Sequence, residues 1–100
     1  MIVEVRMSEE LSSPRLQKYI HAMTEHVLVG FEQDFQCVSV QVFQQPLEPS
    51  ARRFHCVLRV RRASADEFVL DESGSYPHVA VERALESLWQ ILRNRRDSAA

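Results

Sequence analysis

The sequence predicts an α+β fold, a two-layer sandwich in which two helices cover one face of a four-stranded sheet. Two stretches carry apolar residues at three- and four-residue spacing, as amphipathic helices do. Four others alternate apolar and polar residues, as strands with one buried face do. The elements follow in the order β-α-β-β-β-α. An antiparallel sheet with both helices on one face buries every apolar stripe and leaves the other face in solvent.

The length and composition fit a single domain. A chain of 100 residues with 45% hydrophobic content can bury a core without disulfides or metals. We expect one domain over residues 1–97 and a disordered tail over residues 98–100. The sequence shows no signal peptide and no stretch near the roughly 18 apolar residues of a membrane span. We therefore expect a cytoplasmic protein without membrane contact.

The first strand and the first helix are predicted in the N-terminal third. Residues 1–7 alternate, and the core-facing side chains are Val3, Val5 and Met7. A polar connection over residues 8–13 ends at Ser13, which caps a helix with Pro14 at its first position. The inward stripe of this helix comprises Leu16, Ile20, Met23, Val27 and Phe31. We expect the helix to end between Gly30 and Asp34.

Three further strands are predicted before the last helix. Residues 36–44 form the second strand, with Val38, Val40 and Val42 on one face and Cys37, Ser39, Gln41 and Phe43 on the other. Residues 46–51 form a loop, since two prolines remove ladder donors there. Residues 53–61 form the third strand, hairpinned to the second, with Phe54, Cys56, Leu58 and Val60 inward and Arg53, His55, Val57, Arg59 and Arg61 outward. Residues 67–71 form a weaker fourth strand.

The closing helix is the clearest element and extends to Asp97. It begins near Pro77, whose missing N–H costs nothing in a first turn, with Ser75 or Tyr76 at the N-cap. Its apolar stripe comprises Val81, Ala84, Leu85, Leu88 and Leu92, and Trp89 lies beside it at the core boundary. Its last turn carries Arg93, Arg95 and Arg96. These arginines either oppose the negative end of the helix dipole or contact phosphates.

The sequence contains no pattern that predicts catalysis or a metal site. Cys37 and Cys56 lie on opposite faces of the predicted sheet, so we expect free thiols. The four histidines and two cysteines have no zinc-ligand spacing, and no GxGxxG, GxxxxGK[ST] or HExxH string occurs. We expect a protein that is not an enzyme and that needs no cofactor.

The basic residues are nearly all arginine and are unevenly distributed. Residues 1–50 carry three basic against seven acidic side chains, whereas residues 51–100 carry nine arginines against seven acids. Guanidinium groups bind phosphate bidentately, so arginine clusters are candidate RNA contacts. The candidates are Arg93, Arg95 and Arg96 at the end of the last helix, and Arg53, Arg59 and Arg61 on the open sheet face, where His55 and Arg6 could join them. The alternative is a solvated face whose arginines pair with Glu4 and neighbouring acids.

Two aromatic residues outside the predicted core have two possible roles. Phe43 lies on the open sheet face and Tyr76 precedes the last helix. Either could stack on a base, although such aromatics more often cover a sheet edge or cap a core.

The stretch GSYPHVAVERALESLWQILRNRR resembles the last helix of the ribosome hibernation factors, the small ribosome-associated inhibitor and hibernation-promoting proteins. That helix has the form Asp-x-Tyr-Ala-Ala-Ile-Asp, then Leu-x-x-Lys-Leu-x-x-Gln-Leu and a basic tail. Here Val79, Ala80, Val81 and Glu82 occupy the Ala-Ala-Ile-Asp positions, Leu85, Leu88 and Leu92 the leucine positions, and Arg93, Arg95 and Arg96 the tail. The element order and spacings agree over nearly the whole chain.

The resemblance implies a compact domain similar in topology to double-stranded RNA-binding domains. It also implies a stress-response role in which the domain binds RNA of the small ribosomal subunit, occupies the decoding channel and holds idle ribosomes inactive. In this chain the family's capping Asp is replaced by Tyr76, followed by Pro77. The family's larger members add a C-terminal dimerising domain, which this sequence lacks, and we expect a monomer or a weak dimer.

The first helix departs from the family by being acidic. Glu25, Glu32 and Asp34 stand against only Arg15 and Lys18, where the family carries basic residues along both helices. This difference supports an alternative hypothesis, that the chain is a protein-interaction module which has lost RNA binding and recognises a basic partner through Glu25, Glu32 and Asp34, or self-associates along a strand edge.

Overall fold

The predicted element order is confirmed. The computed structural model describes residues 1–100 except 49–50, 65 and 100, and it describes no side chains for residues 46–52 and 95–99. The elements are β1 (Ile2–Met7), the short 3₁₀ helix η1 (Glu9–Leu11), α1 (Pro14–Val27), β2 (Phe35–Glu48), β3 (Ala51–Arg62), β4 (Glu67–Gly74) and α2 (Pro77–Ala99). The sequence predicts a polar connection over residues 8–13 but does not predict the η1 turn within it.

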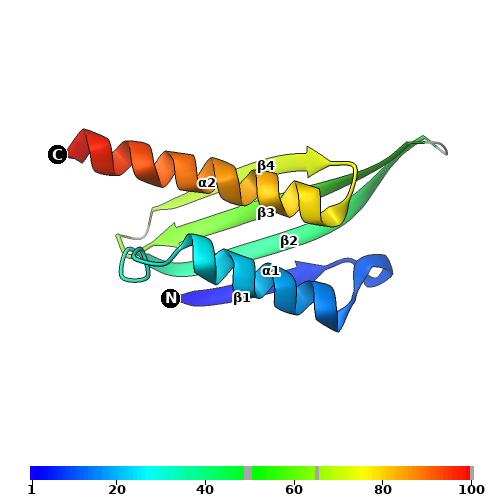
Figure 1. Ribbon diagram of the computed structural model, residues 1–100, viewed down its shortest axis with the longest axis horizontal. Helices are drawn as coiled ribbons and strands as arrows, with labels where there is room; N and C mark the ends of the chain where they lie inside the picture. The colour runs from blue at the N-terminus through cyan, green and yellow to red at the C-terminus, as the bar shows by residue number, and fades with distance from the viewer. Residues whose placement is uncertain (49–50, 65, 100) are drawn as a thin grey trace.

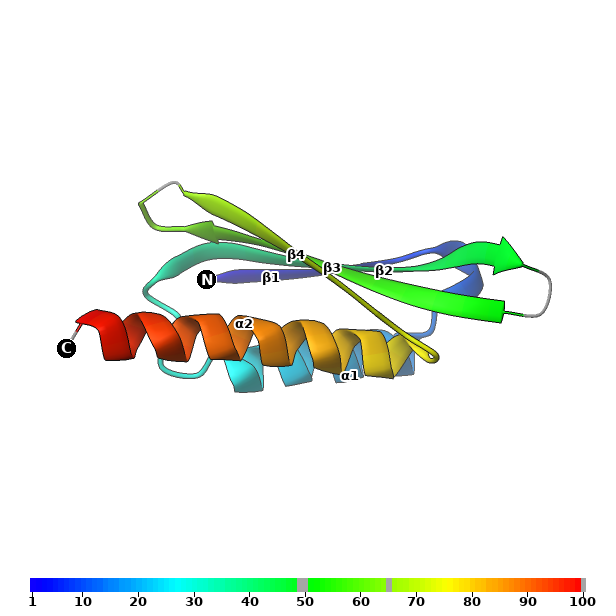
Figure 2. The same cartoon turned by 90° about the horizontal axis from the view of Figure 1, so that it is seen from above.

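The molecule has two layers, a sheet and a pair of helices. The strands lie in the order β1-β2-β3-β4. Both helices pack on the same face of the sheet, with α1 nearer β1 and α2 over β3 and β4 (Figures 1 and 2). The predicted inward stripes of β2, β3 and α2 are buried between the layers, together with Ile20, Leu28, Phe35 and Ala80. The architecture therefore follows from the apolar patterns of the sequence.

The sheet is mixed, whereas the sequence predicted an antiparallel one. β1 pairs with β2 in parallel, while the β2–β3 and β3–β4 pairs are antiparallel. The reason is the β1–α1–β2 crossover, in which the helix returns the chain to the end where β1 began. β2 therefore has to run in the same direction as β1.

Helix α1 begins as predicted but ends earlier. The Ser13 Oγ accepts a hydrogen bond from the Leu16 N–H at 3.3 Å, and Pro14 is the first helical residue. The helix ends at Val27, and Gly30 has a φ of 90°, a conformation that favours glycine and interrupts the helix. Phe31, predicted as part of the helical stripe, packs against the core from the following turn.

The strands are longer than the alternation predicted. β2 continues through Pro46, which pairs with Arg52 beside a register shift, so the segment 46–51 is mostly strand rather than loop. A proline removes only its own N–H donor from the ladder. The end of a strand can tolerate this loss where the register shifts, as it does between Pro46 and Glu48. Residues 49–50 of the predicted loop lie outside the described part of the chain. β4 extends to Gly74, which pairs with Phe54.

Helix α2 begins at Pro77 as predicted, after a close contact with β4. The Tyr76 carbonyl accepts from the Ala80 N–H at 3.2 Å, which places Tyr76 at the N-cap position. The helix continues to Ala99, two residues beyond Asp97 and into the expected tail. Neither Ser98 nor Ala99 is a helix-breaking residue, and alanine has the highest helix propensity.

Candidate nucleic-acid interface

The open face of the sheet carries arginines and acids in cross-strand rows. The register between strands defines these rows because directly paired residues point to the same face. Across β1, β2, β3 and β4 the rows are Ile2, Cys37, Arg61 and Glu67; then Glu4, Ser39, Arg59 and Val69; then Arg6, Gln41, Val57 and Asp71. The predicted outward positions of Arg6, Arg59 and Arg61 are therefore confirmed.

Part of this arginine charge is balanced by neighbouring acids. Arg59 Nη1 lies 3.6 Å from Glu67 Oε1, and Arg6 Nη2 lies 3.9 Å from Glu4 Oε2. Exposed pairs of this kind contribute roughly 0 to 1 kcal/mol, so RNA phosphates can compete for the guanidinium groups at small cost. Arg61 is exposed and forms no ion pair with any described residue. Arg61 is therefore more available to a ligand than Arg59 or Arg6.

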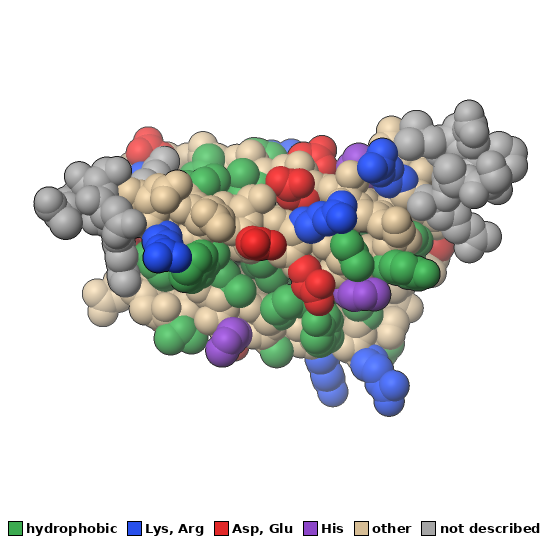
Figure 3. Space-filling view, turned by 45° about the horizontal axis from the view of Figure 1, so that its top comes forward, with side chains coloured by type: hydrophobic (Ala, Val, Ile, Leu, Met, Phe, Trp, Pro, Cys, Tyr) green, Lys and Arg blue, Asp and Glu red, His purple; other side chains and the backbone are tan. Residues whose placement is uncertain are grey.

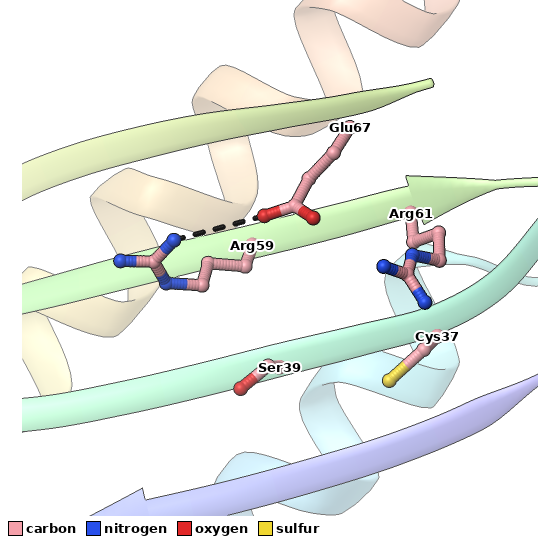
Figure 4. A pocket seen from close by; sticks show the side chains of 5 residues that line it. All are labelled: Cys37, Ser39, Arg59, Arg61 and Glu67. Atoms are coloured by element: carbon pink, nitrogen blue, oxygen red, sulfur yellow. Dashed lines mark ion pairs between the residues drawn. The ribbon is translucent and has the colours of Figure 1, made fainter. Parts of the chain in front are cut away.

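Arg59 and Arg61 border a shallow depression on the open face. It has a volume of about 170 Å³ and is lined by Cys37, Ser39, Arg59, Arg61 and Glu67. The side chains project away from the helices, and Arg61 extends from β3 toward Cys37 on β2 (Figure 4). Two guanidinium groups and a hydroxyl beside one hollow can donate several hydrogen bonds to a single phosphate.

The third arginine predicted for this face lies apart from the other two. Arg53 is exposed on β3, six residues before Arg59. At about 3.3 Å per residue this separation is about 20 Å along the strand, toward the β2–β3 hairpin. The structure therefore joins Arg59 and Arg61 but not Arg53.

The arginines at the end of α2 lie at the same end of the molecule as Arg61. Arg93 is 16 residues into α2, about 24 Å along the helix at 1.5 Å per residue. Arg61 is seven residues along β3 from Phe54, which pairs with the last residue of β4, or about 23 Å. The end of α2 and the end of β3 point the same way in Figure 1. We name Arg59, Arg61 and Arg93 the basic end.

Arg93 is exposed and covers an aromatic ring. Its guanidinium carbon lies 5.2 Å from the ring centroid of Trp89, which is 40% exposed beside the buried Leu85, Leu88 and Leu92 stripe. This cation–π contact holds the cation over α2 without neutralising it. The side chains of Arg95 and Arg96, also predicted as RNA contacts, lie outside the described part of the chain.

The helix-covered side of the molecule has no single sign of charge. Lys and Arg side chains are interspersed with Asp and Glu in Figure 3. On this side the Tyr19 hydroxyl donates to Glu82 Oε1 at 3.2 Å, and Arg83 Nη1 donates to the Ser73 carbonyl at 2.9 Å. The described side chains of this face therefore do not form the basic stripe typical of an RNA-binding surface.

The two aromatic candidates are each stacked on a histidine. The rings of Phe43 and His55 are 5.4 Å apart with an interplanar angle of 10°, and those of Tyr76 and His78 are 5.7 Å apart. His55 also lies 3.2 Å from Asp71, through Nδ1. One face of each aromatic ring is thus occupied by a histidine and is not available to a base.

Two titratable side chains, Cys56 and Tyr19, have pKa values raised above their ordinary range. Burial raises the pKa of the Cys56 thiol to about 12, with a smaller contribution from the Asp71 carboxylate. The thiol is therefore protonated at neutral pH and is not a nucleophile. Burial, followed by the hydrogen bond to Glu82, raises the pKa of Tyr19. Among the described residues, no three His, Cys, Asp or Glu side chains are placed to hold a metal ion.

The acidic residues of the alternative hypothesis are divided between two places. Glu25 and Glu32 line one groove beside β1, which also includes His21, Ile2 and Val29. Asp34 is exposed and does not line this groove. Val29 was not among the predicted surface residues. The signal that could have identified it is that Val29 is apolar but lies outside the predicted apolar stripe of the helix.

Comparisons with known proteins find the fold but no sequence relative. The sequence matches no protein-family model and no curated protein. A ribosomal subunit interface protein from Coxiella burnetii superimposes with a TM-score of 0.72 at 12% identity, over 97% of this chain and 99% of that one. The N-terminal domain of Protein Y from Thermus thermophilus superimposes with a TM-score of 0.64 at 14% identity, over 94% and 98%. The chain therefore has the ribosomal interface protein fold.

Within the described residues, no helix combines the length and the apolar character that crossing a bilayer requires.

Proposed function

We propose that this protein is a ribosome-associated translation regulator that binds RNA of the small subunit and blocks the decoding channel, as hibernation factors do. The observation that carries the proposal is the agreement in fold with a ribosomal subunit interface protein over nearly the full length of both chains. Agreement over whole chains leaves no large insertion in either protein. Such a protein acts in the cytoplasm as a binding protein rather than an enzyme.

The basic end is the surface we propose for the RNA contact. Arg61 is unpaired among the described residues, Arg59 is held only by an exposed pair, and Arg93 lies over Trp89. Phosphate contacts by arginine release counterions, so affinity falls as salt rises, by a log–log slope of about 0.7 to 0.9 per phosphate. Arg95 and Arg96 continue the helix beyond Arg93, and we include them in the proposed contact. Arg53 would make a separate, outlying contact.

Co-sedimentation with purified small subunits over a salt series tests this proposal. Replacing Arg59 and Arg61 by Glu should abolish binding near physiological salt, and the less severe Gln pair should lower the salt slope by about 1.4 to 1.8. A matched control is Arg15→Glu with Lys18→Glu, which makes the same charge change in the first turns of α1. Unchanged binding of the Arg59 and Arg61 variants would refute the site.

Occupation of the decoding channel would have a second measurable consequence. Subunits already loaded with messenger RNA and transfer RNA should bind the protein much more weakly than empty subunits, because the ligands would overlap. Equal binding to loaded and empty subunits would show that the protein associates with the ribosome elsewhere. The Arg93→Glu, Arg95→Glu and Arg96→Glu triple variant tests whether the end of α2 shares the contact.

A further inference from the structure

A groove runs along the outer edge of the sheet, between the beginning of β1 and the last turns of α1. Its volume is about 560 Å³, and its walls include Ile2 and Val3 from β1, and His21 and Glu25 from α1. Val29 and Glu32, from the turn after α1, complete it. The groove lies at β1, whereas the basic end is formed by β3 and α2. β2 therefore separates the groove from the proposed RNA contact, although Ile2 lies in the same cross-strand row as Arg61.

The β1 side of this groove is an open strand edge. β1 is the first strand in the order β1-β2-β3-β4 and pairs only with β2 among the described strands. The backbone groups of an edge strand that do not bond inward are available to another strand. Beside this edge Ile2 is 62% and Val29 66% exposed. Exposed apolar side chains beside an unpaired edge favour an added strand over free solvent.

The charge of the groove selects the kind of strand that fits. Glu25 Oε1 lies 3.1 Å from His21 Nδ1, and Glu32 Oε2 accepts from the Gly30 N–H at 2.9 Å. Neither carboxylate is paired with a lysine or arginine among the described residues. Their negative charge is therefore available to cations of a partner, and it would repel nucleic acid.

We infer that this groove binds an extended segment of a partner protein in which lysine or arginine alternates with apolar residues. The segment adds a strand to the free edge of β1, and main-chain hydrogen bonds supply part of the affinity. Alternate side chains of a strand share one face. The basic side chains of the segment therefore face Glu25 and Glu32, while its apolar side chains pack beside Ile2.

The test uses the full chain and a fluorescent peptide, acetyl-Lys-Val-Lys-Ile-Lys-Val-amide, in an anisotropy titration. We expect saturable binding that Glu25→Lys with Glu32→Lys weakens at least tenfold. The matched control, Glu9→Lys with Glu10→Lys, makes the same charge change on exposed residues of η1 and should alter affinity less than threefold. A peptide with proline in place of isoleucine should not bind, because proline cannot donate to a ladder.

Three results would overturn the inference. Equal weakening by both charge-reversal pairs would mean that the peptide senses net charge rather than the groove. Backbone amide shifts in an NMR titration that fall outside β1 and residues 21–32 would place the peptide elsewhere. A concentration-dependent dimer in analytical ultracentrifugation, lost in Val29→Lys and not displaced by the peptide, would assign the edge to a second copy of the chain.

The inference is separable from the proposed ribosome contact. Arg59→Glu with Arg61→Glu should alter peptide affinity less than threefold, and Glu25→Lys with Glu32→Lys should leave co-sedimentation with small subunits intact. Failure of ribosome binding with retained peptide binding would reject only the proposed function. The reverse pattern would reject only the peptide groove. Circular dichroism and thermal unfolding of each variant show that the fold is retained.

Discussion

Gly74, where β4 meets α2, provides the sharpest test of how this chain positions its last helix. A Cβ atom at this position would lie 2.9 Å from Val79 Cγ1 and 3.0 Å from the Ala80 backbone nitrogen. Overpacking of this kind costs about 1 to 3 kcal/mol. Gly74 does not have a positive φ, so alanine would also gain about 0.4 to 1 kcal/mol by restricting the unfolded chain. We expect Gly74→Ala to be destabilised by about 0.5 to 2 kcal/mol.

Denaturant unfolding followed by circular dichroism measures this change, and a lower melting temperature by about 4 to 8 °C per kcal/mol should accompany it. The source of the cost is tested in a Val79→Ala background, which removes the Cγ1 atom. Gly74→Ala should then cost at least about 0.5 kcal/mol less, a coupling expected only of residues in contact. A Gly74→Ala protein as stable as the parent would refute the close approach of β4 and α2.

Three further predictions concern the Ser13 cap, the labelling of the thiols and the pH dependence of stability. Ser13→Ala should lower the free energy of unfolding by about 1 kcal/mol, because the Leu16 N–H loses its acceptor, whereas Ser13→Asp should retain most of it; equal stability of all three would contradict the cap. In the folded protein a thiol reagent should label the half-buried Cys37 and spare the buried Cys56 until denaturant is added. The free energy of unfolding should fall as pH rises from 9 toward 12, by up to about 1.4 kcal/mol per pH unit, because the unfolded chain releases the Cys56 proton at lower pH than the folded protein. Cys56→Ala should show a shallower fall, and parallel pH profiles would contradict the raised pKa.

The buried layer could be predicted from the sequence because burial imposes a period. The alternation around Val40 and Leu58 and the helical spacing around Leu88 each have only one face that can be buried. The direction of β1 could not be predicted in this way, since parallel and antiparallel pairing bury the same face. The end of α1 at Val27 could not be predicted in this way either, because the apolar spacing continues to Phe31 and does not mark where the helical backbone ends.

The candidate site could be predicted only in part, because a sequence pattern indicates which face a residue lies on but not which residues lie next to it in space. Alternation places Arg53, Arg59 and Arg61 on one face, but it does not say which acids lie opposite them. The pairing of Arg59 with Glu67 depends on the β3–β4 register. That Arg61 and the end of α2 lie at the same end of the molecule depends on how far the helix runs back along the sheet. Both are long-range facts of the fold.

The low identity of the structural neighbours is consistent with these limits. At 12% and 14% identity the shared property is the order and spacing of buried stripes, which many sequences can satisfy. A fold retained at this distance does not by itself retain a ligand, because the ligand depends on surface side chains. The tests that decide the function are therefore the charge reversals on the surface rather than further comparison of the core.

The charge distribution predicts an orientation if the ribosome is the partner. Arg59, Arg61 and Arg93 lie toward the ends of β3 and α2, while the β1 edge carries Glu25 and Glu32 without a lysine or arginine partner among the described residues. RNA would attract the arginines and repel Glu25 and Glu32. Repulsion of this kind fixes the orientation of the bound protein as effectively as attraction does. The basic end would then contact the RNA, and the β1 groove, on the far side of β2, would lie beside that contact rather than within it. A protein segment could reach that groove while the RNA contact is made, so simultaneous binding of peptide and small subunit is the arrangement that these surfaces favour.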